Sequence, residues 1–243
     1  MAPKKPAQRT RTAEKAPPRK RLSGAERERR IVRAAALFFS EHGFDGSTRR
    51  LAARLGVTQA LLYRYFPSKQ KLIDRVFETA FANRWDPSWR ALLTDPARSV
   101  EARLIDFYRE YLGRSTEVSM RLWMRANLDG LNFAGRFSGS LTTHVMKPIV
   151  GELRQIAGLR PLSEAPLMRG ERELVMLLHG SMVFLSIRRH VYRMPMPDDL
   201  GDVVALHVRS FLPGALEEIR RLHGEAADPS LKIQVLDPPA RRK

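Results

Sequence analysis

The sequence predicts an all-α fold in which a small N-terminal helical domain is joined by a linking helix to a larger helical domain. Apolar residues recur at spacings of three and four along most of the chain, which is typical of helices. No segment alternates apolar and polar residues as a half-buried strand does. The Pro-rich segments DPSW and TDPA, within residues 86–97, indicate the joint between the two domains.

The first helix is predicted to begin at Ser23. Ser23 and Glu26 have the three-residue spacing of a capping box, in which each side chain binds the other residue's backbone amide. The apolar residues over 31–38 then fall on one helical face, and Gly43 is suited to end the helix.

Three more helices are expected before the joint. The second begins at Ser47 or Thr48 and ends at Gly56, and the third is capped by Thr58. Pro67 breaks the pattern, and a fourth helix over 68–84 provides the link to the larger domain.

The second and third helices have the spacing of a helix-turn-helix over residues 47–66. Ala52 lies four residues before Gly56 and is small enough for the next helix to cross closely. Gly56 gives the turn its backbone freedom, and Val57 and Leu62 fill the angle between the helices. We therefore expect the opposite face of the third helix to project outward, where it fits the major groove of B-DNA.

The charge distribution favours a polyanionic partner. Residues 1–80 contain 19 Lys and Arg against 7 Asp and Glu, a net charge of +12, out of +17 for the whole chain. Such a surface attracts nucleic acid or an anionic membrane, although a basic surface that only aids solubility is the alternative. The outward groups expected to contact DNA are Thr48, Arg49, Thr58, Gln59, Leu61, Tyr63, Arg64, Tyr65 and Lys69.

Residues 26–81 resemble the TetR family of bacterial transcription regulators. The resemblance is carried by ERRIVRAAALFFSEHGFDG and by TRRLAARLGVTQALLYRYFPSKQKLIDRVFE, of which LLYRYFPSKQKL is the most diagnostic part. It adds Ala60 to the DNA-facing positions, although the family often has Gly where Ala60 stands and His where Tyr65 stands. The resemblance implies an all-helical homodimer that represses genes on double-stranded operator DNA and is released when a small-molecule effector enters the C-terminal domain.

The larger domain, residues 86–224, is expected to bind the effector and to form the dimer. Helices are predicted near 98–113, 116–131, 138–158, 167–192 and 199–223. The last two are the candidates for a four-helix dimer seam, with burial inside the same chain as the alternative. The predicted seam residues are Leu174, Leu177, Leu178, Ser181, Leu185, Val204, His207 and Phe211.

A ligand pocket in this domain should combine many apolar side chains with a few polar ones. Its predicted residues are Trp123, Met124, Asn127, Phe133, Phe137, His144, Met146, Met176, His179 and Phe184, for which ordinary core packing is the alternative.

The remaining segments and residue types exclude several classes of protein. Residues 1–22 are predicted to be a basic disordered tail and residues 225–243 a flexible tail. The chain has no Cys, and no nucleophile elbow, phosphate-binding loop or zinc-protease motif occurs, so we expect no enzyme, metal or cofactor. The apolar run at 174–187 is too short to span a membrane. We expect a cytoplasmic protein that is associated with the nucleoid through its DNA binding. The alternatives are a nucleic-acid or membrane-surface adaptor acting through the tail, and an enzyme whose site assembles from distant residues.

Overall fold

The computed structural model describes residues 23–81, 86–131 and 133–224, so both predicted tails lie outside the described residues. Within these ranges the chain forms α-helices and one π-helical segment and contains no strand, which confirms the all-α prediction. None of the described helices is both long and apolar enough to cross a lipid bilayer.

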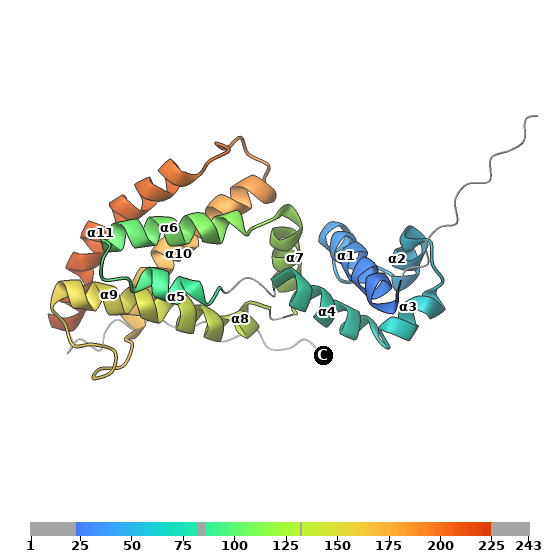
Figure 1. Cartoon of the computed structure of the whole chain (residues 1–243), viewed down its shortest axis with the longest axis horizontal. Helices are drawn as coiled ribbons and strands as arrows, with labels where there is room; N and C mark the ends of the chain where they lie inside the picture. Colours follow the sequence, from blue (N-terminus) through green and yellow to red (C-terminus); the bar gives the residue numbers. More distant parts are fainter. Residues whose placement is uncertain (1–22, 82–85, 132, 225–243) are drawn as a thin grey trace, which may run out of the picture.

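The N-terminal unit comprises four helices, which are joined by short turns at one end of the elongated molecule (Figure 1). They are α1 (Gly24–His42), α2 (Thr48–Leu55), α3 (Gln59–Tyr65) and α4 (Lys69–Phe81). The predicted capping box is present at α1, where the Ser23 amide donates to Glu26 Oε2 at 2.8 Å and the Glu26 amide donates to Ser23 Oγ at 3.2 Å.

Stacked aromatic rings form the centre of this unit. Phe44 lies between Phe39 and Phe77, with ring centroids 5.2 and 5.3 Å away, and Phe81 continues the stack. Leu122 and Ala126 complete the same hydrophobic cluster from α7 (Glu117–Leu128), which lies between the N-terminal unit and the rest of the chain (Figure 1).

The other helices surround a second hydrophobic cluster. They are α5 (Ser88–Leu93), α6 (Val100–Gly113), α8 (Phe133–Leu141), the π-helical segment η1 (Thr142–Met146), α9 (Lys147–Ala157), α10 (Arg169–His190) and α11 (Gly201–Gly224). Trp89, Phe107 and Tyr108 are its largest fully buried aromatic residues. The long helix α11 packs against α6, α9 and α10 and closes this cluster.

Two predicted boundaries differ from the structure. The Pro-rich joint contains the short helix α5, because Pro87 has helical backbone angles and Asp86 accepts hydrogen bonds from the amide and hydroxyl of Ser88 at 2.9 and 2.6 Å. Proline therefore starts this helix instead of preventing it. The helix expected over 138–158 begins earlier, at Phe133, and η1 interrupts it.

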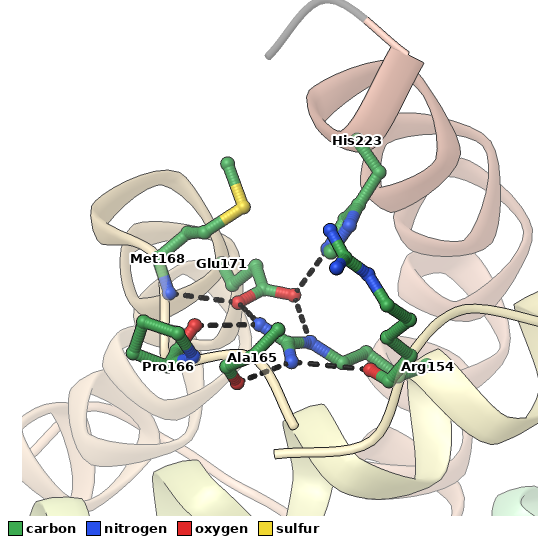
Figure 2. Close-up of polar contacts among 7 residues, drawn as sticks. Arg154, Ala165, Pro166, Met168, Glu171 and His223 are labelled. Atoms are coloured by element: carbon green, nitrogen blue, oxygen red, sulfur yellow. Dashed lines mark hydrogen bonds and ion pairs between the residues drawn. The ribbon is translucent and has the colours of Figure 1, made fainter. Parts of the chain in front are cut away.

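A buried ion pair holds the connection between α9 and α10. Arg154 and Glu171 are both 0% exposed, and two guanidinium nitrogens donate to the two carboxylate oxygens at 2.6 Å. Figure 2 shows the same guanidinium reaching the carbonyls of Ala165 and Pro166, at 2.8 and 2.9 Å. On its other side, His223 of α11 places Nε2 at 2.9 Å from Glu171 Oε1, so three helices meet at one carboxylate.

Candidate nucleic-acid interface

The turn between α2 and α3 has the geometry that the sequence predicted. Gly56 adopts the left-handed conformation, with φ of 66°, and its amide donates to the carbonyls of Ala52 and Ala53 in α2. The Val57 amide donates to the Ala52 carbonyl at 3.0 Å, and Thr58 Oγ1 accepts from the Leu61 amide at 3.2 Å. Leu62 is 1% exposed, so the inner face of α3 is fixed against the N-terminal core.

A small polar network ties the start of α2 to the outer face of α3. Gln59 Nε2 donates to Thr48 Oγ1 at 3.0 Å, and that oxygen lies 3.2 Å from the Tyr63 hydroxyl. Thr48 is 8% exposed, whereas the Tyr63 ring is 39% exposed. Thr48 is therefore placed to orient Gln59 and Tyr63, and these two side chains are exposed to solvent, where a partner could contact them.

The other DNA-facing candidates lie around this network. Arg49, Thr58, Gln59, Ala60, Tyr63 and Arg64 are exposed, and Leu61, Tyr65 and Lys69 are half-buried. Tyr65 packs against the hydrophobic cluster of the N-terminal unit, so most of its ring contributes to the fold. Lys69 begins α4, close in sequence to the end of α3.

The electrostatic character of this surface is uniformly basic. Residues 47–73 contain no Asp or Glu, and Arg49, Arg64 and Lys69 make no ion pair within the described part of the chain. Glu41 of α1 binds Arg54 of α2, and this hydrogen bond lowers the pKa of the Glu41 carboxyl. That carboxylate is therefore neutralised beside α2.

Sequence reasoning omitted Arg50 from this surface. Its side chain is exposed and its guanidinium lies 6.0 Å from the centroid of the Phe38 ring, toward α1. The adjacent pair of arginines at the start of α2 was the signal that could have included it.

Comparison with known proteins agrees with this geometry. The family model for the TetR family of bacterial regulatory proteins matches residues 31–76, which extend from α1 into α4. The class A tetracycline repressor of Escherichia coli is 39% identical over 85 residues, covering 32% of this chain and 39% of that protein. The N-terminal unit is therefore similar to the TetR family of bacterial regulatory proteins.

Two other proteins extend the likeness beyond α4. The transcriptional repressor NicS of Pseudomonas putida is 28% identical over 193 residues, covering 75% of this chain and 86% of NicS. The solved structure of a TetR-like regulator from a Rhodococcus species has a TM-score of 0.55 at 21% identity, and covers 80% of this chain and 100% of that one. The solved structure supports the fold over 80% of the chain. The chain spans only 39% of the length of each of the two tetracycline repressors that it matches.

The structure separates the residues predicted for a TetR-family ligand pocket. Trp123 packs edge-on against Phe81 in the N-terminal cluster, while His179 lies beside Tyr108 and Tyr111 in the second cluster. Met146 is buried, Met124 and Met176 are half-buried, and Asn127, His144 and Phe184 are exposed. The side chains of Phe133 and Phe137 lie outside the described residues. The described residues do not test this set as the lining of one cavity, so the pocket stays a prediction.

The predicted dimer residues divide between two faces of α10 and α11. Leu174, Leu178, Leu185 and Val204 are at most 8% exposed and belong to the chain's own core, which is the alternative that the sequence left open. Ser181, His207 and Phe211 are half-buried, and His207 Nδ1 lies 3.0 Å from Ser181 Oγ.

The solvent-exposed sides of α10 and α11 carry large apolar side chains. Leu177 is 68% exposed, Phe184 is 48% exposed and Leu206 of α11 is 63% exposed. Leu177 and Phe184 are seven residues apart, two turns along the same side of α10. Phe184 is absent from the predicted seam because spacing alone cannot distinguish an inward stripe from an outward one.

Proposed function

We propose that this chain is a homodimeric transcriptional repressor that binds operator DNA through α3 and leaves it when a small molecule binds. The observation that carries the proposal is the locked α2–α3 pair, which presents Gln59, Tyr63 and Arg64 on a surface free of carboxylates. The relatives named as the tetracycline repressor and as the repressor NicS support the same activity. Such a protein acts on the chromosome in the cytoplasm.

In this proposal α3 enters the major groove. Gln59 is suited to donate to and accept from adenine, and Leu61 to contact a thymine methyl group. Arg49 at the start of α2 and Lys69 at the start of α4 bind phosphates on either side, where helix N-termini also favour anions. Phosphate contacts fix the position of α3, and base contacts supply the sequence preference.

A dimer places two α3 helices on successive turns of DNA, about 34–36 Å apart. The outward apolar face of α10 and α11, formed by Leu177, Phe184 and Leu206, is the surface we assign to the partner copy. Two such helix pairs would form a four-helix seam. Residues 23–85 then serve as the DNA-binding domain and residues 86–224 as the ligand-binding and dimerisation domain.

Release requires a connection between the two domains. The fourth helix provides one, and α7 provides a second because Asp129, at its C-terminal end, accepts the Phe44 amide at 2.9 Å. A ligand that binds one arrangement of the larger domain more tightly would thereby change the spacing of the two α3 helices.

The test is selection of bound duplexes from random DNA, followed by affinity measurements on the enriched sequence. Tyr63→Ala is expected to weaken specific binding by about 1–3 kcal/mol, and Arg90→Ala, at an exposed position of α5, should have no effect. Equal losses in both variants, or no enriched sequence, would refute the assignment. Deleting residues 1–22 discriminates against the adaptor alternative, since sequence preference should survive the deletion.

A further inference from the structure

A cavity of about 270 Å³ lies where α1, α4 and α7 meet, away from the DNA-facing surface of α3. Its apolar floor is formed by Val32 and Ala36 of α1, Val76 and Ala80 of α4, and Val118 of α7. Because these three helices come from both sides of the predicted domain joint, an occupant would contact the N-terminal unit and α7 together.

The rim of the cavity is cationic. Glu28 binds Arg75 across the α1–α4 seam, with the carboxylate oxygen 3.2 Å from Nε, and Arg75 also lies 3.2 Å from Glu78. Arg29 and Arg33 line the same rim, one turn apart on α1, and neither makes a hydrogen bond or ion pair within the described residues. One carboxylate and three guanidiniums therefore border the cavity, and two of the guanidiniums are available to a ligand.

The hydroxyl groups around the cavity are already used. Thr116 and Ser119 bind each other and each other's backbone in the cap of α7. Thr79 donates to the Arg75 carbonyl at 2.9 Å. The polar recognition offered by this site is thus cationic, which selects for a negative charge on the ligand.

We propose that this cavity binds a small amphiphilic anion. Its carboxylate or comparable head group would bind the guanidiniums of Arg29 and Arg33, and its apolar body would cover Val32, Val76 and Val118. The volume lies just below the range of roughly 300–1,000 Å³ found for pockets of drug-sized ligands, so the occupant is compact. The inference concerns binding to the chain without DNA, and it stands apart from the proposed repressor activity.

The probe is octanoate, whose binding to the full-length protein is measured by isothermal titration calorimetry in the absence of DNA. Acetate has the same head group without the apolar body, and octyltrimethylammonium has the body with the opposite charge. We expect one octanoate per chain and no measurable binding of either comparison compound. Absence of octanoate binding, or equal binding of the cationic compound, would overturn the proposal.

Matched variants locate the site. The double substitution Arg29→Gln and Arg33→Gln is expected to weaken octanoate binding by about tenfold or more, because it removes charge-assisted hydrogen bonds. The double substitution Arg27→Gln and Arg30→Gln removes the same charge from α1 outside the cavity lining and should leave binding unchanged. Equal losses in the two doubles would show a general charge effect and would contradict the site.

A third variant tests the cavity itself without altering its charge. Thr79→Trp introduces a large ring at an exposed position of the rim and is expected to abolish octanoate binding. Thermal unfolding of each variant establishes that it is folded. Octanoate binding that persists in folded Thr79→Trp and in the Arg29/Arg33 double would place the ligand elsewhere and refute the inference.

Discussion

Replacing Arg154 by methionine is expected to lower the free energy of unfolding by about 3–5 kcal/mol, the usual cost of removing one partner of a buried ion pair. Arg154 and Glu171 are both 0% exposed, so water cannot replace the lost guanidinium without opening the structure. The substitution leaves the Glu171 carboxylate with only His223 and the Met168 amide, at 2.9 Å each. It also removes the donor for the carbonyls of Ala165 and Pro166 in the α9–α10 connection.

Urea unfolding followed by circular dichroism measures this loss. The matched control is Arg209→Met, which breaks the 2.8 Å ion pair of Arg209 with Glu101 between α11 and α6, where the side chains are 64% and 41% exposed. Surface pairs contribute about 0–1 kcal/mol, so the control should be close to the original protein. A cost for Arg154→Met no larger than that of Arg209→Met would refute the importance assigned to the buried pair.

The pH dependence of stability gives a second measurement of the same carboxylate. Burial raises the pKa of Glu171, but hydrogen bonds from Arg154, His223 and the Met168 amide outweigh burial and hold this pKa below its ordinary value of 4.5. A lowered folded-state pKa contributes stability that is present above pH 4.5 and is lost as the pH falls below it.

In Arg154→Met, the carboxylate of Glu171 stays buried but loses the hydrogen bonds from the guanidinium that lowered its pKa. The Glu171 pKa in the folded variant should therefore rise above its value in the unfolded chain. The sign then reverses, because the folded variant binds the proton more tightly and loses stability as the pH rises through that pKa. In the original protein, the Glu171 contribution to the free energy of unfolding should fall as the pH is lowered below 4.5. In Arg154→Met, it should fall as the pH is raised above 4.5, so unfolding curves are collected on both sides of this pH. Parallel profiles would contradict the assigned cause of the shift.

Two further predictions concern the turn and the dimer. Gly56→Ala should lower the free energy of unfolding by about 1–2 kcal/mol, the cost of a side chain in the left-handed backbone conformation. A Cβ at this position meets no atom within 4 Å, so no steric cost is added. Gly46→Ala should lower the free energy of unfolding by more, because its Cβ would lie 2.6 Å from Phe38 Cε1. Thermal unfolding compares the two, and a smaller loss at Gly46 would contradict the packing argument. Phe184→Asp should convert the proposed dimer to monomers in sedimentation experiments, while Leu128→Asp, which is more exposed on α7, should not. A dimer that persists in Phe184→Asp would exclude this seam.

Local signals explain which parts of the structure could be predicted. The capping box at Ser23 and Glu26 and the left-handed turn at Gly56 depend on residues within a few positions of one another. The helix-turn-helix could therefore be located from the sequence alone. The exposed side chains Gln59, Tyr63 and Arg64 could be named with it, whereas Thr48, predicted to face outward, is only 8% exposed. Asp86 and Pro87 also form a local signal: the Pro-rich composition predicts a joint between the domains, whereas Pro87 is the N-cap residue of α5.

Long-range packing could not be predicted in the same way. Helix α10 has buried residues on the side of Leu174 and Leu178 and exposed apolar residues on the side of Leu177 and Phe184. Both stripes repeat at helical spacing, so the sequence cannot tell which of them meets the same chain. The pairing of Arg154 with Glu171 likewise joins residues 17 positions apart that share no motif.

Helix α7 shows how packing bears on the proposed release mechanism. Leu122 and Ala126 lie in the hydrophobic cluster of the N-terminal unit, and Asp129 binds the Phe44 amide. At its other end, Glu117 accepts from Arg193, just beyond α10, at 2.7 Å; that pair is largely exposed and contributes little energy. The apolar contacts are therefore the stronger attachment, so α7 should move with the N-terminal unit when α10 shifts. A change at the α10–α7 boundary would then reorient α1 and, through the shared core, α3.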